Sequence, residues 1–207
     1  MGAATADHEL LTAWRAGDAE RGNELVQRHF ESVYAFLRSK VPDQVDELVQ
    51  RTFLACVEAV ERIDETRSVR AYLFGIARRQ LIYHFRRTQR HDARFDPMET
   101  SVCDAGGSPS RLAAARQAQA QVLDALHRLP LDLQITLELH YWEDMSVAEI
   151  AVVLEIPPGT VKSRLHRARD RLRAVLEEEG ATAASIEHSV GHLRQLRQTL
   201  GMTPGPH

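Results

Sequence analysis

Apolar residues recur every three or four positions along most of this 207-residue chain, and no segment convincingly alternates apolar and polar residues as a strand would. Such spacing places apolar side chains on one face of an α-helix. The sequence therefore predicts an all-α fold. The periodicity and the capping residues predict helices over about residues 7–16, 18–40, 43–63, 69–90, 111–128, 131–142, 146–154 and 160–179.

The chain changes character between His91 and Pro109, where periodic apolar residues give way to Gly, Pro, Ser and Asp. This composition indicates a linker. We therefore expect two small helical domains joined by a flexible linker, the second of which contains a helix-turn-helix. The expected boundaries are 1–92 for the first domain, 93–112 for the linker, 113–179 for the second domain, and 180–207 for a C-terminal extension with a short helix and a disordered tail.

Composition limits where the protein can act. The start of the chain lacks the basic-then-apolar pattern of a signal peptide. No apolar run approaches the roughly 18 residues that a membrane span requires. We therefore expect a cytoplasmic protein with no membrane insertion. The two cysteines, Cys56 and Cys103, share no short spacing, so neither a thiolate metal site nor a disulfide framework is expected.

The histidines are scattered rather than clustered. Only His188 and His192 have the i, i+4 spacing that puts two ligands on one helix face, and they lack a third ligand. An acidic group at Asp43, Asp46 and Glu47 has no histidine nearby. We therefore expect no metal, no other cofactor and no enzymatic activity.

The charges are distributed unevenly along the chain. The net charge is −3, yet residues 78–94 and residues 160–173 each carry +5, which leaves −13 for the rest. Two basic segments in an otherwise acidic chain indicate two separate contacts with polyanions.

The segment from Ser146 onward has the pattern of a helix-turn-helix. Ser146 and Glu149 can form a capping box, Pro157 to Gly159 can form a turn, and a basic helix follows. A solvated basic helix packed on a helical hairpin is the plainer alternative. One face of the last helix is apolar, with Val161, Leu165, Ala168, Leu172 and Leu176, and the other presents the candidate DNA-contacting residues Lys162, Ser163, Arg164, His166 and Arg167.

We make predictions about the backbone at two positions in this motif. Thr160 is placed to cap the basic helix, whose free N–H groups would favour a phosphate. Glu155 occupies a turn position where many such motifs have glycine. We expect an unfavourable backbone angle there, at a cost of about 1 kcal/mol.

Two helices of the first domain present candidate binding surfaces. Arg79, Tyr83, Arg86 and Arg90 share one face, which suits phosphates and stacked bases of partly single-stranded DNA. A surface stripe with a half-buried tyrosine is the alternative. On the preceding helix an apolar Leu54 faces outward among mostly acidic residues, which resembles the centre of a protein-docking patch. Taken alone, an isolated exposed leucine is the plainer alternative.

At these residues the sequence resembles the extracytoplasmic-function (ECF) sigma factors, the minimal two-domain promoter-recognition subunits of bacterial RNA polymerase. DELVQRTFLACVEAVERID (46–64) resembles the helix that binds core polymerase. VRAYLFGIARRQLIYHFRR (69–87) resembles the −10 recognition and melting helix, and residues 123–172 resemble the −35-binding domain. The chain departs from the common family pattern at Tyr72, Arg79 and Tyr83, which leaves the −10 preference open.

The resemblance implies partners and roles for particular residues. The partners would be the clamp helices of the largest subunit of core polymerase, promoter DNA and an anti-sigma factor. The polymerase-binding residues would be Glu47, Leu48, Gln50, Phe53 and Leu54, with Leu48 and Phe53 supporting the others from the core. The −10 element would be bound by Asp64, Arg67, Arg78, Arg79, Tyr83, Arg86 and Arg87, and the −35 element by Thr160, Lys162, Ser163, Arg164, His166 and Arg167.

Two classes of function follow from these patterns. The first is a sigma factor that binds core polymerase and directs promoter recognition and melting. The alternative is a dimeric helix-turn-helix regulator that does not bind polymerase. The outward Leu54 and the second basic segment favour the sigma factor. For the free chain we expect the linker to permit a compact, inactive state.

Overall fold

The computed structural model describes residues 2–63, 68–88, 96–101, 114–181 and 193. Within these ranges the chain is helical and has no β-strand, only an isolated bridge between Ser101 and Pro130. The expected all-α fold is confirmed. In chain order the elements are α1 (Gly2–Arg15), α2 (Ala19–Arg38), η1 (Pro42–Gln44), α3 (Val45–Glu58), η2 (Val60–Arg62), α4 (Val69–Thr88), α5 (Ala114–His127), α6 (Leu131–Tyr141), α7 (Val147–Leu154) and α8 (Pro158–Glu178).

The predicted helix ends are confirmed where the sequence supplied a cap. The Asp18 side chain accepts hydrogen bonds of 3.1 Å from the backbone N–H groups of Glu20 and Arg21. Ser146 and Glu149 form the expected capping box ahead of α7. These side chains satisfy N–H groups that the first turn of a helix leaves without a partner. Between α1 and α2 the chain turns at Gly17, whose φ of +98° disfavours any residue with a Cβ.

The start of α8 differs from the prediction. Thr160 does not cap this helix, because Pro157 is the N-cap and Pro158 the first helical residue. Proline suits that position since its φ is already helical and its missing N–H would have had no partner. Thr160 therefore lies inside the first turn. The unfavourable backbone angle expected in the turn before this helix is found at Glu155, which adopts the left-handed conformation with φ 57° and ψ 43°.

Helices α1 to α4 form the amino-terminal region, in which a buried charged contact fixes α1 on α2. Asp7 and His29 are both buried, and Oδ2 of Asp7 lies 2.8 Å from Nε2 of His29. Arg28 contacts the other carboxylate oxygen at 3.0 Å. Gly22 allows the two helices this close approach, since a Cβ there would lie 2.6 Å from the ring of Trp14.

Helices α5 to α8 form the carboxyl-terminal region, which is built around α6. Residues Leu131 to Leu139 of α6 are all buried, because α5, α7 and α8 pack around this helix. The five predicted anchors of α8 are buried as well. The C-terminal extension contributes Leu193, which is buried and whose carbonyl accepts a 2.9 Å hydrogen bond from the indole N–H of Trp142.

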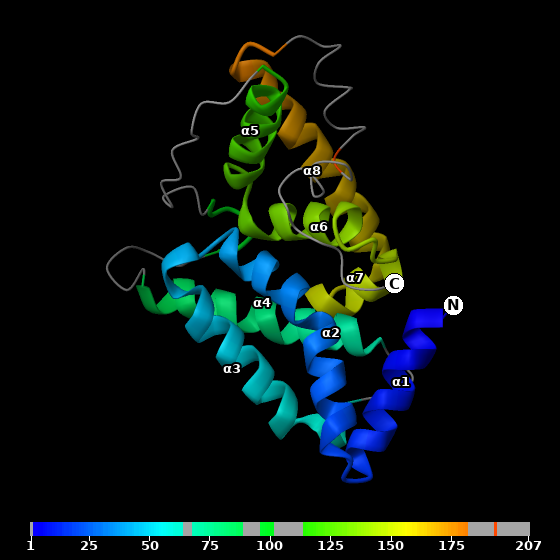
Figure 1. Ribbon diagram of the computed structural model, residues 1–207. Coiled ribbons are helices and arrows are strands. Elements are labelled where there is room, and N and C mark those ends of the chain that lie inside the picture. Colours follow the sequence, from blue (N-terminus) through cyan, green and yellow to red (C-terminus); the bar gives the residue numbers. More distant parts are fainter. Residues whose placement is uncertain (1, 64–67, 89–95, 102–113, 182–192, 194–207) are drawn as a thin grey trace.

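The two regions lie directly against each other, with α4 beside α7 (Figure 1). A single hydrophobic cluster spans both regions and includes Phe36 and Phe74 from the first and Ile135 and Ile150 from the second. We call this contact the junction. It is the compact arrangement that the linker was expected to permit. The exact domain boundaries stay predictions.

Part of the expected linker packs on α6 rather than running free. The backbone N–H of Leu131 donates to the carbonyl of Thr100, and that of Asp132 to the carbonyl of Pro97, both at 2.9 Å. The linker thus satisfies two N–H groups of the first turn of α6. The rest of the linker lies outside the described residues. None of the described helices is long and apolar enough to cross a bilayer.

Replacing Asp7 by asparagine should destabilise the fold. Burial raises the pKa of Asp7, but hydrogen bonds and charges from His29 and Arg28 outweigh burial and hold the pKa below its ordinary value. We expect Asp7→Asn to lower the free energy of unfolding by about 2 kcal/mol at pH 7. Urea denaturation followed by circular dichroism measures this difference.

The pH dependence of this difference identifies its cause. A carboxyl with a depressed pKa in the folded state stabilises the fold above its unfolded pKa of about 3.9, and this stabilisation is lost as the pH falls through the folded value. The gap between wild type and Asp7→Asn should therefore be full at pH 7 and shrink below about pH 4. A gap independent of pH would contradict this assignment. Glu9→Gln, on the same helix, is the control.

Candidate functional site: an apolar groove and two basic helices

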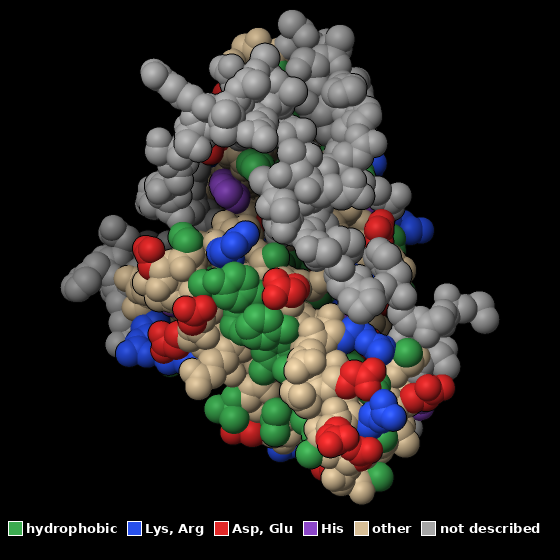
Figure 2. Space-filling model, in the orientation of Figure 1, with side chains coloured by type: hydrophobic (Ala, Val, Ile, Leu, Met, Phe, Trp, Pro, Cys, Tyr) green, Lys and Arg blue, Asp and Glu red, His purple; other side chains and the backbone are tan. Residues whose placement is uncertain are grey.

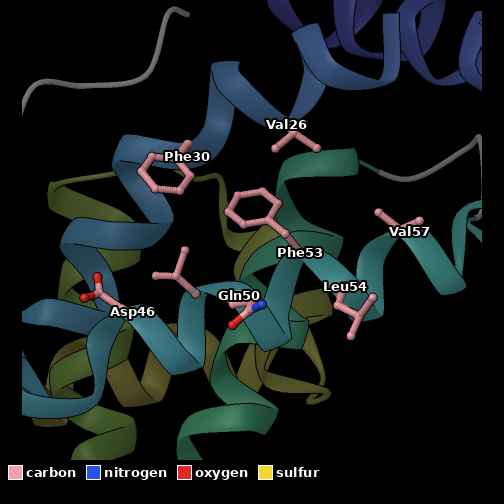
Figure 3. Close-up of a pocket in the computed structure, with 8 residues that line it drawn as sticks. Val26, Phe30, Asp46, Gln50, Phe53, Leu54 and Val57 are labelled. Atoms are coloured by element: carbon pink, nitrogen blue, oxygen red, sulfur yellow. The ribbon is translucent and has the colours of Figure 1, made fainter. Parts of the chain in front are cut away.

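A groove of about 510 Å³ lies between α2 and α3 on the surface of the amino-terminal region. Figure 3 shows that the two helices line it from either side, with Phe30 and Phe53 facing each other across it. Three of its apolar residues are exposed, namely Phe30, Leu54 and Val57. The lining residues are Val26, Phe30, Asp46, Val49, Gln50, Phe53, Leu54 and Val57.

Phe30 of α2 is only partly covered by α3. Its side chain is 39% exposed, and its ring stacks on Phe53 of α3 at a centroid distance of 5.9 Å and on Tyr34 at 6.0 Å. Helical periodicity shows which face of α2 is apolar, but not how far α3 covers that face. Two residues of α2, Val26 and Phe30, line the groove. The sequence did not predict either of them as a site residue.

Acidic side chains lie beside the groove. Figure 2 shows a hydrophobic patch over α2 and α3 with acidic side chains beside it. Asp46, Glu47, Glu58 and Glu61 are exposed along the α3 side. Glu47 also pairs with Arg51 one helical turn away, at 2.5 Å. The groove thus offers an apolar floor and a mostly negative rim.

The predicted polymerase-binding residues do not all reach this surface. Glu47, Gln50 and Leu54 are exposed, and Leu54 is the most exposed of the apolar residues of the groove, at 56%. Phe53 is half-buried and lines the groove, whereas Leu48 is buried in the core beneath it. Leu48 thus lies in the core as expected, whereas Phe53 forms part of the groove surface itself.

The predicted −10 residues on α4 fall into two groups. Tyr83, Arg86 and Arg87 are exposed on the outer part of the helix. Arg78 and Arg79 instead turn towards the carboxyl-terminal region, where each contacts a carboxylate. The remaining two, Asp64 and Arg67, lie outside the described residues.

The predicted −35 residues occupy the first turns of α8. Lys162, Ser163, His166 and Arg167 are exposed, and Thr160 is half-buried. Three internal contacts order this face. The Ser163 hydroxyl donates to the carbonyl of Thr160 at 2.9 Å, His166 lies 2.6 Å from Asp170, and Arg164 contacts Asp132 at 3.0 Å.

In the described part of the chain, no group of three or more His, Cys, Asp or Glu side chains is placed to hold a metal ion. His188 and His192 lie outside that part. Cys56 is buried, and burial raises the pKa of its thiol to about 11. A thiol with so high a pKa is almost entirely protonated at neutral pH and unreactive.

Family comparisons define the class of protein to which these surfaces belong. The model of sigma-70 region 2 matches residues 25–91, and the model of sigma-70 region 4 matches residues 119–172. The groove and α4 lie within the first match, and the helix-turn-helix lies within the second.

Similarity to individual relatives narrows the class from sigma-70 proteins to one family. The ECF RNA polymerase sigma factor SigL of Mycobacterium tuberculosis is 35% identical over 144 residues, which cover 67% of this chain and 78% of SigL. The ECF RNA polymerase sigma-E factor of Escherichia coli is 27% identical over 177 residues, which cover 80% of this chain and 92% of the relative. This chain belongs to the ECF RNA polymerase sigma factors and has the function of a sigma factor.

Solved structures share the fold. CnrH, solved in complex with the cytosolic domain of CnrY, superimposes with a TM-score of 0.61 at 28% identity and covers 84% of this chain and 98% of its own. The sigma factor RpoE of Bartonella quintana, solved with the anti-sigma factor NepR, gives a TM-score of 0.59 at 24% identity, covering 76% and 97%. Family membership favours the sigma factor over the dimeric regulator.

Proposed function

We propose that this sigma factor binds the clamp helices of the largest polymerase subunit through the α2–α3 groove, and that α4 and α8 recognise promoter DNA. The chain itself would catalyse nothing and would act in the cytoplasm, where bacterial polymerase works. The observation that carries the proposal is the exposed apolar groove on α3, within the segment that matches sigma-70 region 2.

The groove has the properties of a helix-binding surface. An amphipathic helix docks by laying apolar side chains into a hydrophobic groove, and Phe30, Leu54 and Val57 provide exposed apolar area for such a contact. Aromatic and aliphatic anchors surrounded by polar residues typically carry most of the binding energy. Because the rim holds Asp46, Glu47, Glu58 and Glu61, a helix with basic flanks would fit best.

The outer face of α4 suits single-stranded DNA at the −10 element. Arg86 and Arg87 are exposed and can contact phosphates, while the exposed ring of Tyr83 can stack on a base. Extruding a base from the duplex costs a few kcal/mol. The resemblance assigns base capture to the loop that contains Asp64 and Arg67, so that α4 would hold the strand while the loop reads it.

The first turns of α8 suit the major groove at the −35 element. Lys162, His166 and Arg167 project from the exposed face of the helix that follows the turn. Arginine can make two hydrogen bonds to guanine, whereas lysine and serine commonly contact phosphates. We also propose an anti-sigma factor as a partner, since the resemblance implies one and CnrH was solved with the cytosolic domain of another protein.

A carboxylate in the groove should weaken polymerase binding. Leu54→Asp places an unpaired charge among the apolar anchors, and we expect Kd for sigma-free bacterial core polymerase to rise at least about thirtyfold, equivalent to about 2 kcal/mol. Gel filtration and a pull-down with purified components measure this change.

A matched variant on another face distinguishes docking from general damage. Tyr83 is as exposed as Leu54, at 56%, but lies on α4. Tyr83→Asp should keep polymerase binding and weaken the binding of single-stranded DNA. If both variants bound polymerase like the wild type, the groove would not be the docking surface.

Two arginines should affect DNA binding in different ways. Arg167→Ala removes a predicted base contact, so we expect weaker −35 duplex binding and altered sequence preference, at a cost of about 1–3 kcal/mol. Arg87→Ala removes a predicted phosphate contact, so binding should weaken for all sequences and its salt slope should fall by about 1. The measurement is a selection from random duplexes with reconstituted holoenzyme, followed by salt titrations. Equal losses on all sequences for both variants would argue against base reading by Arg167.

A further inference from the structure

Three charged or polar side chains of α8 contact one another in a row along one face of the helix. Asp170 lies one turn after His166, and Arg173 lies one turn after Asp170. The Nδ1 atom of His166 lies 2.6 Å from Oδ2 of Asp170. A guanidinium N–H of Arg173 donates to Oδ1 of Asp170 at 3.3 Å. The two oxygens of the Asp170 carboxylate are therefore each occupied by a different neighbour.

The contact with Asp170 determines which ring nitrogen of His166 carries the proton. An ionised carboxylate only accepts hydrogen bonds, so Nδ1 has to donate. A neutral imidazole has a single N–H, so Nε2 keeps a free lone pair and acts as an acceptor. The aspartate of a catalytic triad fixes the tautomer of its histidine in the same way. The His166 side chain is 72% exposed, so this acceptor is accessible to a partner outside the chain.

We propose that Asp170 is a positioning residue for promoter recognition: by fixing the tautomer of His166, it makes α8 select a base with an amino group at one position of the −35 element. This inference rests on the proposed function, because it takes α8 as the helix that enters the major groove. In that groove adenine N6 and cytosine N4 are donors, whereas guanine and thymine present acceptors. An acceptor at Nε2 thus favours adenine or cytosine on the strand that His166 faces.

The position of the two residues along α8 supports separate roles. His166 lies in the early turns of the helix, beside the exposed Lys162 and Arg167, and this part of a recognition helix contacts base edges. Asp170 lies one turn further from the helix start. Its carboxylate repels DNA phosphates, so a direct contact with the DNA backbone is unfavourable. Asp170 therefore contributes to recognition through His166.

Asp170→Asn should reverse the base preference. Asparagine matches aspartate in shape but has one acceptor oxygen and one donor NH2 group. Arg173 has only N–H donors, so it keeps the amide oxygen on its own side and leaves the NH2 group facing His166. Nδ1 then has to accept, and the ring proton moves to Nε2. We expect the variant to prefer guanine or thymine where wild type prefers adenine or cytosine, by about fivefold in each case, the equivalent of one hydrogen bond.

The first measurement is a selection by reconstituted holoenzyme from duplexes randomised over the −35 element. His166→Ala identifies the relevant base position, because preference should be lost there. Adding Asp170→Asn to His166→Ala should change nothing further at that position, since the ring is gone. Glu177→Gln is the control, because it removes a carboxylate from an exposed position later in the same helix and should select bases like wild type.

The second measurement reads the tautomer directly in the free, full-length chain. NMR spectroscopy of protein with isotope-labelled histidine gives the chemical shifts of the ring nitrogens, and His166→Gln identifies the signals of His166. We expect a proton on Nδ1 in wild type and on Nε2 in Asp170→Asn. Circular dichroism verifies that each variant keeps its helix content.

Several outcomes would overturn the proposal. Wild-type His166 protonated on Nε2, or on both nitrogens, would remove the acceptor on which it depends. If Asp170→Asn selects the same bases as wild type, or shifts the preference equally in the His166→Ala background, Asp170 does not act through His166. If Glu177→Gln produces the same shift, the cause is the change in net charge.

Failure of the proposed function would give a different pattern. In that case neither His166→Ala nor Arg167→Ala would alter the selected bases, and both the −35 role of α8 and the role of Asp170 would be excluded. If Arg167→Ala alters the selection but His166→Ala does not, α8 reads the −35 element without His166. Only the positioning role of Asp170 would then be excluded.

Discussion

A carboxylate removed from water requires a partner, and this requirement governs how the two regions meet. Helix α6 is buried along Leu131 to Leu139, although it carries Asp132 and Glu138. Burial of an unpaired charge is very costly. The cations that pair with these two side chains include Arg78 and Lys40, both from the amino-terminal region. Asp132 is also held by Arg164 of α8, but the cation that pairs with Glu138 comes from the amino-terminal region, so burial of α6 in this form depends on that region.

The Lys40–Glu138 pair shows that such contacts specify an arrangement more than they stabilise it. Lys40 is fully buried, and burial lowers the pKa of its ammonium group even though Glu138 opposes that shift. Desolvation thus outweighs the attraction between the two charges, as is common for buried pairs. What the pair contributes is register, because a shift of α6 would separate the two charges while leaving both of them buried. The apolar groove, by contrast, lies between α2 and α3 and takes no residue from the carboxyl-terminal region.

The sequence predicted the structure that depends on residues close together in the chain. It did not predict the contacts between residues far apart in the chain. Asp18, the Ser146–Glu149 box and the outward Leu54 follow from spacing and capping chemistry, which depend on neighbours within a few residues. The exposure of Phe30 and the burial of Lys40 depend on which helix covers them, and periodicity does not contain that information. Arg78 and Arg164 illustrate the same limit, since an arginine suited to a phosphate is equally suited to a carboxylate. Thr160 was misplaced because two prolines compete with it to begin α8.

The contact between the linker and α6 determines how far the two regions can separate. Eight Cα–Cα steps lie between Thr88 and Asp96, and at about 3.5 Å per step they reach about 28 Å. While residues 97 and 100 stay hydrogen-bonded to the first turn of α6, that short tether limits the distance. The Ser101 hydroxyl also donates to the carbonyl of His127. Release of all three bonds makes the 26 steps from Thr88 to Ala114 available, a reach of about 90 Å. Three hydrogen bonds thus decide whether the tether is short or about three times as long.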